Sequence, residues 1–344
     1  MGRALSELHY MRPVERGDLP GLLGLADVLG GAVTTLPPDR ESLAARIDDS
    51  VAAFGRRIRS PGSEWYLFVL CDPAGTVRGT SGIIGRVGGF DPYYAYEIRT
   101  EVHEHPPLGI RKEVEVLHLR REHKGPSELA SLALDPALRA KGLGRLLSLS
   151  RLLFMAAQRE RFADVVIAEL RGYQDPDGRS PFWESVGRHF FDRSFAEADF
   201  LSGLGNKDFI EDLMPRHPIY LSLLPPEVRE SVGRPHPQTE PAMHMLEREG
   251  LTRSGEVDIF DAGPIVAGRV DELATVRGHL RLRVRRVADR QPDGPICLVG
   301  NGRVDFRAAL AAVGDEGEDA VALSRAAAAA LGVGLGDVVQ VVRR

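Results

Sequence analysis

The chain has 344 residues, and at about 150 residues per domain this length favours two domains. Hydrophobic residues make up 43% and charged residues 27%, a globular composition that excludes disordered and fibrous classes. With 44 Lys and Arg against 49 Asp and Glu the net charge is −5. We therefore expect no nucleic-acid partner, because dedicated nucleic-acid-binding proteins usually carry a basic excess.

Three further features of the sequence indicate where the protein works. No apolar run approaches the roughly 18 residues that a transmembrane helix needs. Glu7 and His9 stand where a signal peptide would need an apolar stretch. Cys71 and Cys297 alone cannot build a disulfide scaffold or a zinc–cysteine cluster. We expect a cytoplasmic protein with no membrane partner.

The first 90 residues predict helices followed by a hairpin. The expected elements are a strand over 11–14, helices over 18–29 and 40–58, and strands over 64–72 and 77–87. Asp39 is a plausible N-cap of the second helix. Pro73-Ala74-Gly75 is typical of the turn between the two later strands. This order is a common start of an α+β domain.

The middle of the chain predicts a strand–loop–helix–strand unit. A strand over 129–134 stops at Asp135-Pro136, and a long helix covers 144–162. Residues 164–170 are apolar enough for a strand in the centre of a sheet. Such a unit forms a right-handed crossover.

The last 100 residues predict a helix over 242–249 that ends at Gly250, and then a strand over 257–261. From about residue 264 the chain changes to short β-rich segments, a helix over 326–331 and a strand over 338–342. We interpret this part as a small β-barrel, so the predicted domains are 1–265 and 266–344.

One basic stretch, residues 277–286, needs an explanation in an acidic protein. Its Arg281, Arg283 and Arg285 alternate with apolar residues. This period of two predicts a strand with one solvated face rather than a nucleic-acid surface.

The segment Arg139-Ala140-Lys141-Gly142-Leu143-Gly144 lies between the central strand and the long helix. Its glycines let backbone N–H groups approach a phosphate, and the following helix adds a partial positive charge. A Walker A loop does not match. A Rossmann fingerprint fails because Leu147 replaces its third glycine.

The segment instead resembles the pyrophosphate loop, Arg/Gln-x-x-Gly-x-Gly/Ala, of the GNAT acyltransferase superfamily, and the order of elements agrees. The resemblance implies a GNAT-like acyl-CoA N-acyltransferase fold. Its central strand would splay from its neighbour and hold the pantetheine through its backbone, with Leu132 near the thioester. Arg139, Gly142 and Gly144 would bind the pyrophosphate.

A narrower resemblance, over about residues 11–285, is to the arginine N-succinyltransferase family. It is carried by the runs Phe154-Met155-Ala156-Ala157, Ser180-Pro181-Phe182-Trp183, Ala198-Asp199-Phe200-Leu201, Leu213-Met214-Pro215-Arg216-His217-Pro218-Ile219-Tyr220, His236-Pro237-Gln238-Thr239 and Asp258-Ile259-Phe260-Asp261-Ala262-Gly263-Pro264. The resemblance implies transfer of the succinyl group of succinyl-CoA to the α-amine of L-arginine.

His236 is the candidate catalytic residue. It lies between Pro235 and Pro237, and an imidazole titrates near working pH. The family resemblance assigns the matching histidine as proton donor. His217, also followed by a proline, is the alternative, and Glu169 is a candidate base or structural carboxylate.

The two substrates set further requirements. A guanidinium needs acidic partners, and the candidates are Glu197, Asp199, Glu211 and Asp212. The distal carboxylate of a succinyl group needs a cation, and the candidates are Arg86, Lys124 and Arg171. Tyr93, Tyr94 and Tyr96 line the acyl pocket or only pack. We expect no metal site, because His103-Glu104-His105 lies in a loop-like stretch with unsuitable spacing.

The expected protein is therefore an acyltransferase with succinyl-CoA as co-substrate, no permanently bound cofactor, and an oligomeric state. Two alternatives remain open at this point. One is an enzyme that accepts ornithine, or both amino acids. The other is a non-enzymatic regulator, because the C-terminal pattern also resembles small barrel domains of DNA-binding regulators.

Overall fold

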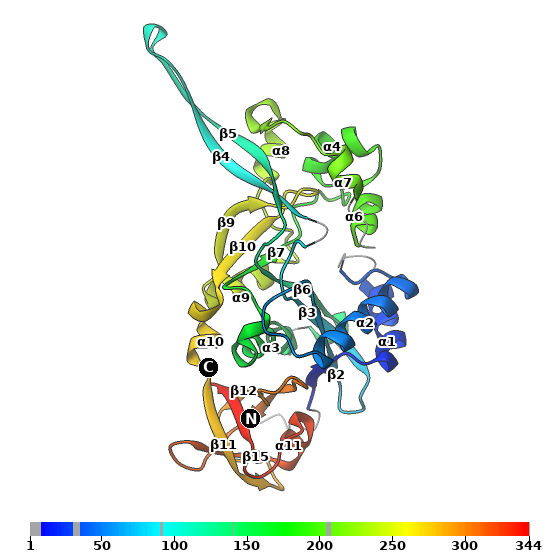
Figure 1. The fold of residues 1–344 in the computed structure, drawn as a ribbon, viewed down its shortest axis with the longest axis vertical. Coiled ribbons are helices and arrows are strands. Elements are labelled where there is room, and N and C mark those ends of the chain that lie inside the picture. The colour runs from blue at the N-terminus through cyan, green and yellow to red at the C-terminus, as the bar shows by residue number, and fades with distance from the viewer. Residues whose placement is uncertain (1–7, 30–34, 90–91, 140, 204–207, 344) are drawn as a thin grey trace. The chain divides into compact units, whose positions relative to one another are not determined.

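A computed structural model of the chain describes residues 8–29, 35–89, 92–139, 141–203 and 208–343. The chain forms two compact units. Unit 1 comprises Met1–Gly85, Leu129–Val165 and Arg269–Arg344, and unit 2 comprises Arg86–Glu128 and Val166–Gly268. Mixed helices and strands confirm the predicted α+β class (Figure 1).

Unit 1 contains the N-terminal helices, the helix of the crossover and the C-terminal strands. Its helices are α1 Leu19–Leu29, α2 Arg40–Gly55, α3 Leu143–Ala157, α10 Ala274–Gly278 and α11 Arg325–Leu331. Its strands are β1 Tyr10–Pro13, β2 Trp65–Cys71, β3 Val77–Ile84, most of β6 Ser127–Leu134, β11 Leu280–Ala288, β12 Ile296–Gly300, β13 Ala308–Ala312, β14 Gly314–Asp315, β15 Ala320–Ser324 and β16 Val338–Val342.

The sheet of unit 1 runs in the order β14-β15-β11-β16-β12-β13-β1-β2-β3-β6. The C-terminal strands thus join the N-terminal ones, since Tyr10 of β1 pairs with Ala309 of β13. The predicted closed C-terminal barrel is not confirmed, because the described strands follow one another as an open sheet. The boundary between domains 1–265 and 266–344 stays a prediction.

Aromatic side chains form one core of unit 1. Phe154 of α3 contacts Phe68 at a ring-centroid distance of 5.2 Å and Phe306 at 5.3 Å. All three rings are fully buried. Phe306, from the C-terminal segment, therefore packs against the N-terminal hairpin and the crossover helix, so this segment contributes to the core of unit 1.

Unit 2 contains the remaining strands of the same sheet and most of the short helices. Its helices are α4 Pro181–Ser185, α5 Arg188–Phe191, α6 Phe195–Gly203, α7 Asp208–Leu213, α8 Pro226–Ser231 and α9 Glu240–Glu249. Its strands are β4 Tyr93–His105, β5 Ile110–Glu122, β7 Val165–Glu169, β8 Ile219–Tyr220, β9 Thr252–Val257 and β10 Pro264–Arg269. The order is β7-β10-β9-β4-β5-β8.

Most local predictions agree with the structure. Asp39 caps α2 by accepting a hydrogen bond from Ser42 N at 2.7 Å. The hairpin of β2 and β3 is antiparallel, and the strand–helix–strand unit of β6, α3 and β7 is present. Gly250 ends α9 with a φ of 105°. The arginines 281, 283 and 285 are exposed and alternate with buried neighbours along β11.

Two local predictions are wrong. Residues 258–261 form a turn instead of a strand, because the Asp258 carboxylate accepts hydrogen bonds from Phe260 N and Asp261 N. His103-Glu104-His105 lies inside β4 instead of a loop, in a hairpin of 13 residue pairs with β5 (Figure 1). The alternation Glu113-Val114-Glu115-Val116 was the signal for this hairpin.

Candidate functional site

The strand that carries Leu132 contains a local break. Ser131 has a φ of 53°, which is left-handed for a residue other than glycine. Its amide donates to Thr35 Oγ1 at 3.1 Å, so a side chain replaces a strand partner there. Leu132 follows directly and is partly exposed, whereas Ser131 and Ala133 are buried. The break turns the backbone of β6 next to the predicted thioester position.

The pairing of β6 with β7 is short. The structure gives the parallel pairs Ser127 with Val166 and Glu128 with Ile167, and Leu129–Leu134 then belong to unit 1. Such a short ladder agrees with the splay that the GNAT resemblance implies.

A buried guanidinium lies behind the same strand. Arg151 of α3 is 2% exposed and donates to Ala130 O at 3.3 Å and to Ser148 Oγ at 3.2 Å. Burial lowers its pKa to about 9. Arg151 thus holds the carbonyl just before the break at Ser131. Sequence reasoning did not find this contact, because its partners are the backbone of a distant strand.

The glycine loop leads into α3. Gly142 is the N-cap with a φ of 79°, a conformation that favours glycine, and no side chain caps the helix. The first amides of an uncapped helix have no helical acceptor and can bind an anion. Arg139, Lys141 and Arg145 are all exposed around this end. The first turn contains no acidic residue.

Gly144 lies within the first turn of α3. A Cβ at Gly144 would meet no heavy atom within 4 Å. A side chain at this position would therefore point into open space. Leu132, Arg139, Gly142 and Gly144 all belong to unit 1.

His236 belongs to unit 2 and lies on a loop that several backbone hydrogen bonds hold. His236 N donates to Arg171 O at 2.8 Å, and Tyr173 N donates to Arg234 O at 2.9 Å. Gly172 forms a bridge with Pro235. The stretch from Arg171 to Tyr173, which follows β7, is therefore the support of the histidine.

The turn of residues 258–261 holds the segment of residues 171–173 in place. Asp261 accepts from Gly172 N at 2.7 Å and from Gly263 N at 2.7 Å. Asp261 is buried and Asp258 is partly buried, and loss of solvent raises the pKa of each carboxyl. The negative charge of Asp258 raises the pKa of Asp261 further. Asp261, which belongs to the motif at residues 258–264, thus binds Gly172, and Gly172 pairs with Pro235 next to His236.

The protonation state of His236 follows from its contacts. Gln238 N donates to Nδ1 at 3.1 Å, so Nδ1 is an acceptor and the neutral ring carries its proton on Nε2. Partial burial lowers the pKa of His236 from its ordinary value, and the charge of Arg171 lowers it further. At neutral pH His236 thus offers an Nε2–H donor.

The other residues proposed from the sequence, His217, Glu169 and the three tyrosines, have different surroundings. His217 is exposed on a turn, whereas Glu169 accepts a hydrogen bond from Tyr93 Oη at 2.7 Å. Burial and the charges of Glu169 and Glu128 raise the pKa of Tyr93 well above its usual range. Tyr94 and Tyr96 are core residues of unit 2.

The four acidic candidates for binding the guanidinium differ in their hydrogen-bond and ion-pair partners. Glu197 accepts from Ser194 N and Oγ, and Glu211 pairs with Arg121 at 2.7 Å, so both already serve the fold. Asp199 is partly buried and Asp212 is exposed.

Arg86 is the strongest of the three cationic candidates. Its Nε is buried and finds no acceptor in the described part of the chain. Arg171 donates to Gln174 at 2.6 Å, and Lys124 is exposed.

The described residues contain neither a metal-binding cluster nor a membrane-spanning helix. No group of three His, Cys, Asp or Glu side chains among them could hold a metal ion. No helix that they form is long and apolar enough to cross a membrane.

Comparison with known proteins identifies the family to which the chain is similar. Residues 9–275 match the family "arginine N-succinyltransferase beta subunit", and residues 281–343 match its C-terminal domain. Arginine N-succinyltransferase of Enterobacter sp. (strain 638) is 44% identical over 97% of both chains, and that of Yersinia enterocolitica is 44% identical over 96% of both.

A solved structure is similar over nearly the whole chain. It is subunit AI of the arginine/ornithine succinyltransferase of Pseudomonas aeruginosa, with a TM-score of 0.89 and 37% identity. The match covers 98% of this chain and 99% of that chain.

Proposed function

The chain belongs to the arginine N-succinyltransferase family, and we propose that it transfers the succinyl group of succinyl-CoA to the α-amine of L-arginine. The products are N2-succinylarginine and CoA. The observation that carries this proposal is the high identity, over nearly the full length, to proteins named for that activity.

In this proposal the fold is GNAT-like and unit 1 binds CoA. Amides of the uncapped α3 terminus at Gly142 and Gly144 bind the pyrophosphate, and Arg139 adds a positive charge. The backbone of Leu132, next to the break at Ser131, binds the pantetheine and polarises the thioester carbonyl. CoA is a co-substrate that leaves after each turnover, and no cofactor stays bound.

His236 acts on the departing sulfur. The neutral amine of arginine attacks the thioester carbon, the amine nitrogen becomes positively charged, and the C–S bond breaks. The Nε2–H of His236 donates a hydrogen bond to the departing sulfur, and the proton lost by the amine nitrogen passes to that sulfur, so the reaction is balanced in protons and no imidazolate forms. The hydrogen bond from Gln238 N supports this role, because it keeps the ring proton on Nε2.

Arg86 is the residue that we propose for the distal carboxylate of the succinyl group. Its buried Nε lacks an acceptor in the described part of the chain, and a carboxylate would supply one. This carboxylate is what distinguishes succinyl-CoA from acetyl-CoA.

A thiol-release assay tests the activity. We expect arginine-dependent release of CoA from succinyl-CoA, with N2-succinylarginine identified by mass spectrometry. Cys71 and Cys297 are both buried, so the protein itself should give little background with a thiol reagent. Release without arginine dependence, or no release, would contradict the proposal. Tight DNA retention without turnover would favour the regulator instead.

Ornithine is the second candidate acceptor. The similar structure from Pseudomonas aeruginosa is named for both arginine and ornithine. Comparing kcat/KM for the two amino acids in the same assay decides between single and dual specificity. We further propose an oligomer in the cytoplasm, which light scattering and cell fractionation test.

A further inference from the structure

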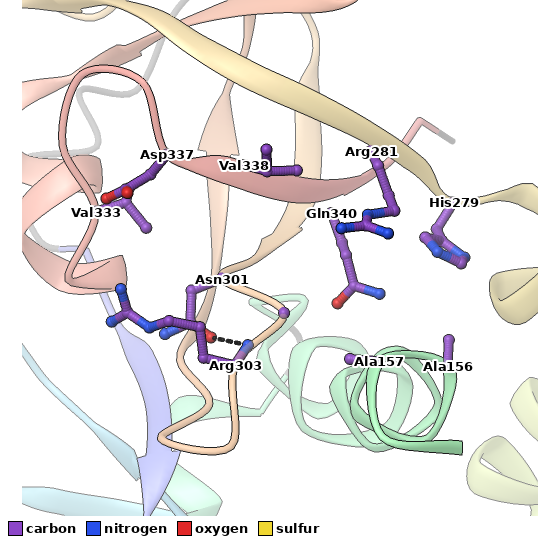
Figure 2. A pocket seen from close by; sticks show the side chains of 11 residues that line it. Ala156, Ala157, His279, Arg281, Asn301, Arg303, Val333, Asp337, Val338 and Gln340 are labelled. Atoms are coloured by element: carbon purple, nitrogen blue, oxygen red, sulfur yellow. Dashed lines mark hydrogen bonds between the residues drawn. The ribbon is translucent and has the colours of Figure 1, made fainter. Parts of the chain in front are cut away.

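A polar pocket lies in unit 1, and none of the residues proposed above for succinyl transfer lines it. Its volume is about 350 Å³, and it lies between the end of α3 and the C-terminal strands β11 and β16 (Figure 2). This volume falls in the range of sites for small molecules, about 300–1,000 Å³.

The floor of the pocket contains an unsatisfied acceptor. Gln340 lies between Val339 and Val341 in β16 and is only 4% exposed. Its Oε1 is buried and receives no hydrogen bond from any described residue. A buried polar atom without a partner costs free energy, so it points to a donor that a ligand brings.

A free cation lies next to this acceptor. Arg281 of β11 is the direct ladder partner of Gln340, so the two side chains share one face of the sheet. Gln340 extends toward the helix that carries Ala156 and Ala157, and the guanidinium of Arg281 turns toward the side chain of Gln340 (Figure 2). Arg281 forms no ion pair with a described residue, whereas Arg286 on the same strand pairs with Glu316.

The other polar groups of the pocket are placed by the fold. His279 Nδ1 lies 2.7 Å from Val276 O, which fixes the ring. Arg303 is bound to Asp305. Asp337 accepts from Gly334 N through Oδ2 at 2.8 Å and also lines the pocket.

We propose that this pocket binds a free basic α-amino acid. Arg281 binds the carboxylate, because a guanidinium and a carboxylate can form two parallel hydrogen bonds. Gln340 Oε1 accepts from the α-ammonium group, and Asp337 receives the cationic side chain. The choice of arginine as the first probe rests on the proposed function. The recognition of a basic amino acid by Arg281, Gln340 and Asp337 is independent of that function.

Alanine-methyl NMR of the full chain tests the site directly. Ala156 and Ala157 line the pocket, and single Ala→Ser variants assign their methyl signals. Millimolar L-arginine should shift both signals. Agmatine, which lacks the carboxylate, should not shift them. L-norvaline, which lacks the cationic side chain, should bind more weakly than arginine.

Two variants separate specific binding from general effects. Arg281→Gln should weaken the arginine response at these methyls at least tenfold. Arg285→Gln, at another exposed position of β11, should leave it unchanged. An unchanged affinity of the Arg281→Gln protein, equal shifts with agmatine, or no shift with arginine would each overturn the proposal.

These outcomes do not depend on turnover. Arginine bound at the catalytic site would shift other alanine methyls, and a chain without succinyl transfer could still show the response of Ala156. Failure of the pocket and failure of the proposed activity are therefore distinguishable.

Discussion

The side chain of His236 is where the proposed chemistry is most easily tested. General acid–base groups contribute about 10²–10⁴ in rate, so His236→Ala should lower kcat by that order with little change in KM. Steady-state thiol release measures both constants. His217→Ala is the matched control and should retain normal kcat, because His217 is exposed on a turn. A near-normal kcat of the His236→Ala enzyme would show that another group serves the departing sulfur.

The pH dependence of His236 follows from its lowered pKa. Burial is the main cause and the charge of Arg171 adds to it, so the ring should titrate below 6.5, its ordinary value. Because the folded pKa is the lower one, the stability that this group contributes is present above pH 6.5 and is lost as the pH falls through the folded pKa.

Nitrogen-15 NMR of the imidazole measures both the pKa and the tautomer. We expect the Nε2–H form at neutral pH and protonation only below pH 6.5. Activity should fall over the same pH range, because protonation places a hydrogen on Nδ1 and breaks the contact with Gln238 N. A ring with the proton on Nδ1 would contradict the proposed geometry.

Arg86 should control the choice of acyl group. A hydrogen bond to a charged group contributes about 1.5–3 kcal/mol, so Arg86→Gln should lower kcat/KM for succinyl-CoA by about 10–150-fold. Butyryl-CoA, which has the same chain length without the carboxylate, should be little affected. An equal loss with both substrates would indicate that Arg86 serves only the fold.

At the scale of elements, we predict that the start of α3 binds CoA. Gly144→Asp should abolish tight CoA binding, since its carboxylate would repel the pyrophosphate. The same substitution should not unfold the helix, because an acidic residue in the first turn is favourable there. Gly144→Ala is the control, since a Cβ at this position meets no atom within 4 Å. Calorimetry showing unchanged CoA affinity in the Asp variant would remove the loop from the site.

The elements themselves show which parts of the fold the sequence predicts. Helices α2 and α3 and the hairpin of β2 and β3 follow from local periodicity and caps, because their signals lie within one segment. The strand predicted over 257–261 failed, since the side chain of Asp258 competes with the ladder for backbone amides. The hydrogen bond from Gly172 to Asp261 joins residues 89 apart, and no local pattern contains it.

The candidate site also contains some features that the sequence predicts and others that only the structure reveals. The Gly142–Gly144 loop is visible in the sequence because two closely spaced glycines stand directly before a predicted long helix. His236 was identified by its family resemblance, whereas the Gln238 contact that sets its tautomer required the structure. The pocket at Arg281 was missed, because an alternating strand explains the arginine without a ligand.

At the scale of the whole molecule, we expect residues 267–344 to be necessary for folding. Truncation at residue 266 removes β13, which pairs with β1, and removes Phe306 from the aromatic core. We expect an aggregated product, assessed by size-exclusion chromatography. Phe306→Ala isolates the packing contribution and should lower the free energy of unfolding by about 3–5 kcal/mol. A soluble, fully active truncation would contradict this prediction.

The pairing of β1 with β13 also has a consequence for biosynthesis. The two strands are separated by roughly 300 residues of chain. A ribosome adds about 5–20 residues per second, so β1 waits about 15–60 s before its partner is made. During that interval β1 presents an unpaired strand edge to the other nascent chains of the polysome. Slower translation of the C-terminal codons should therefore lower the soluble yield, and a holdase that covers the N-terminal segment should restore it.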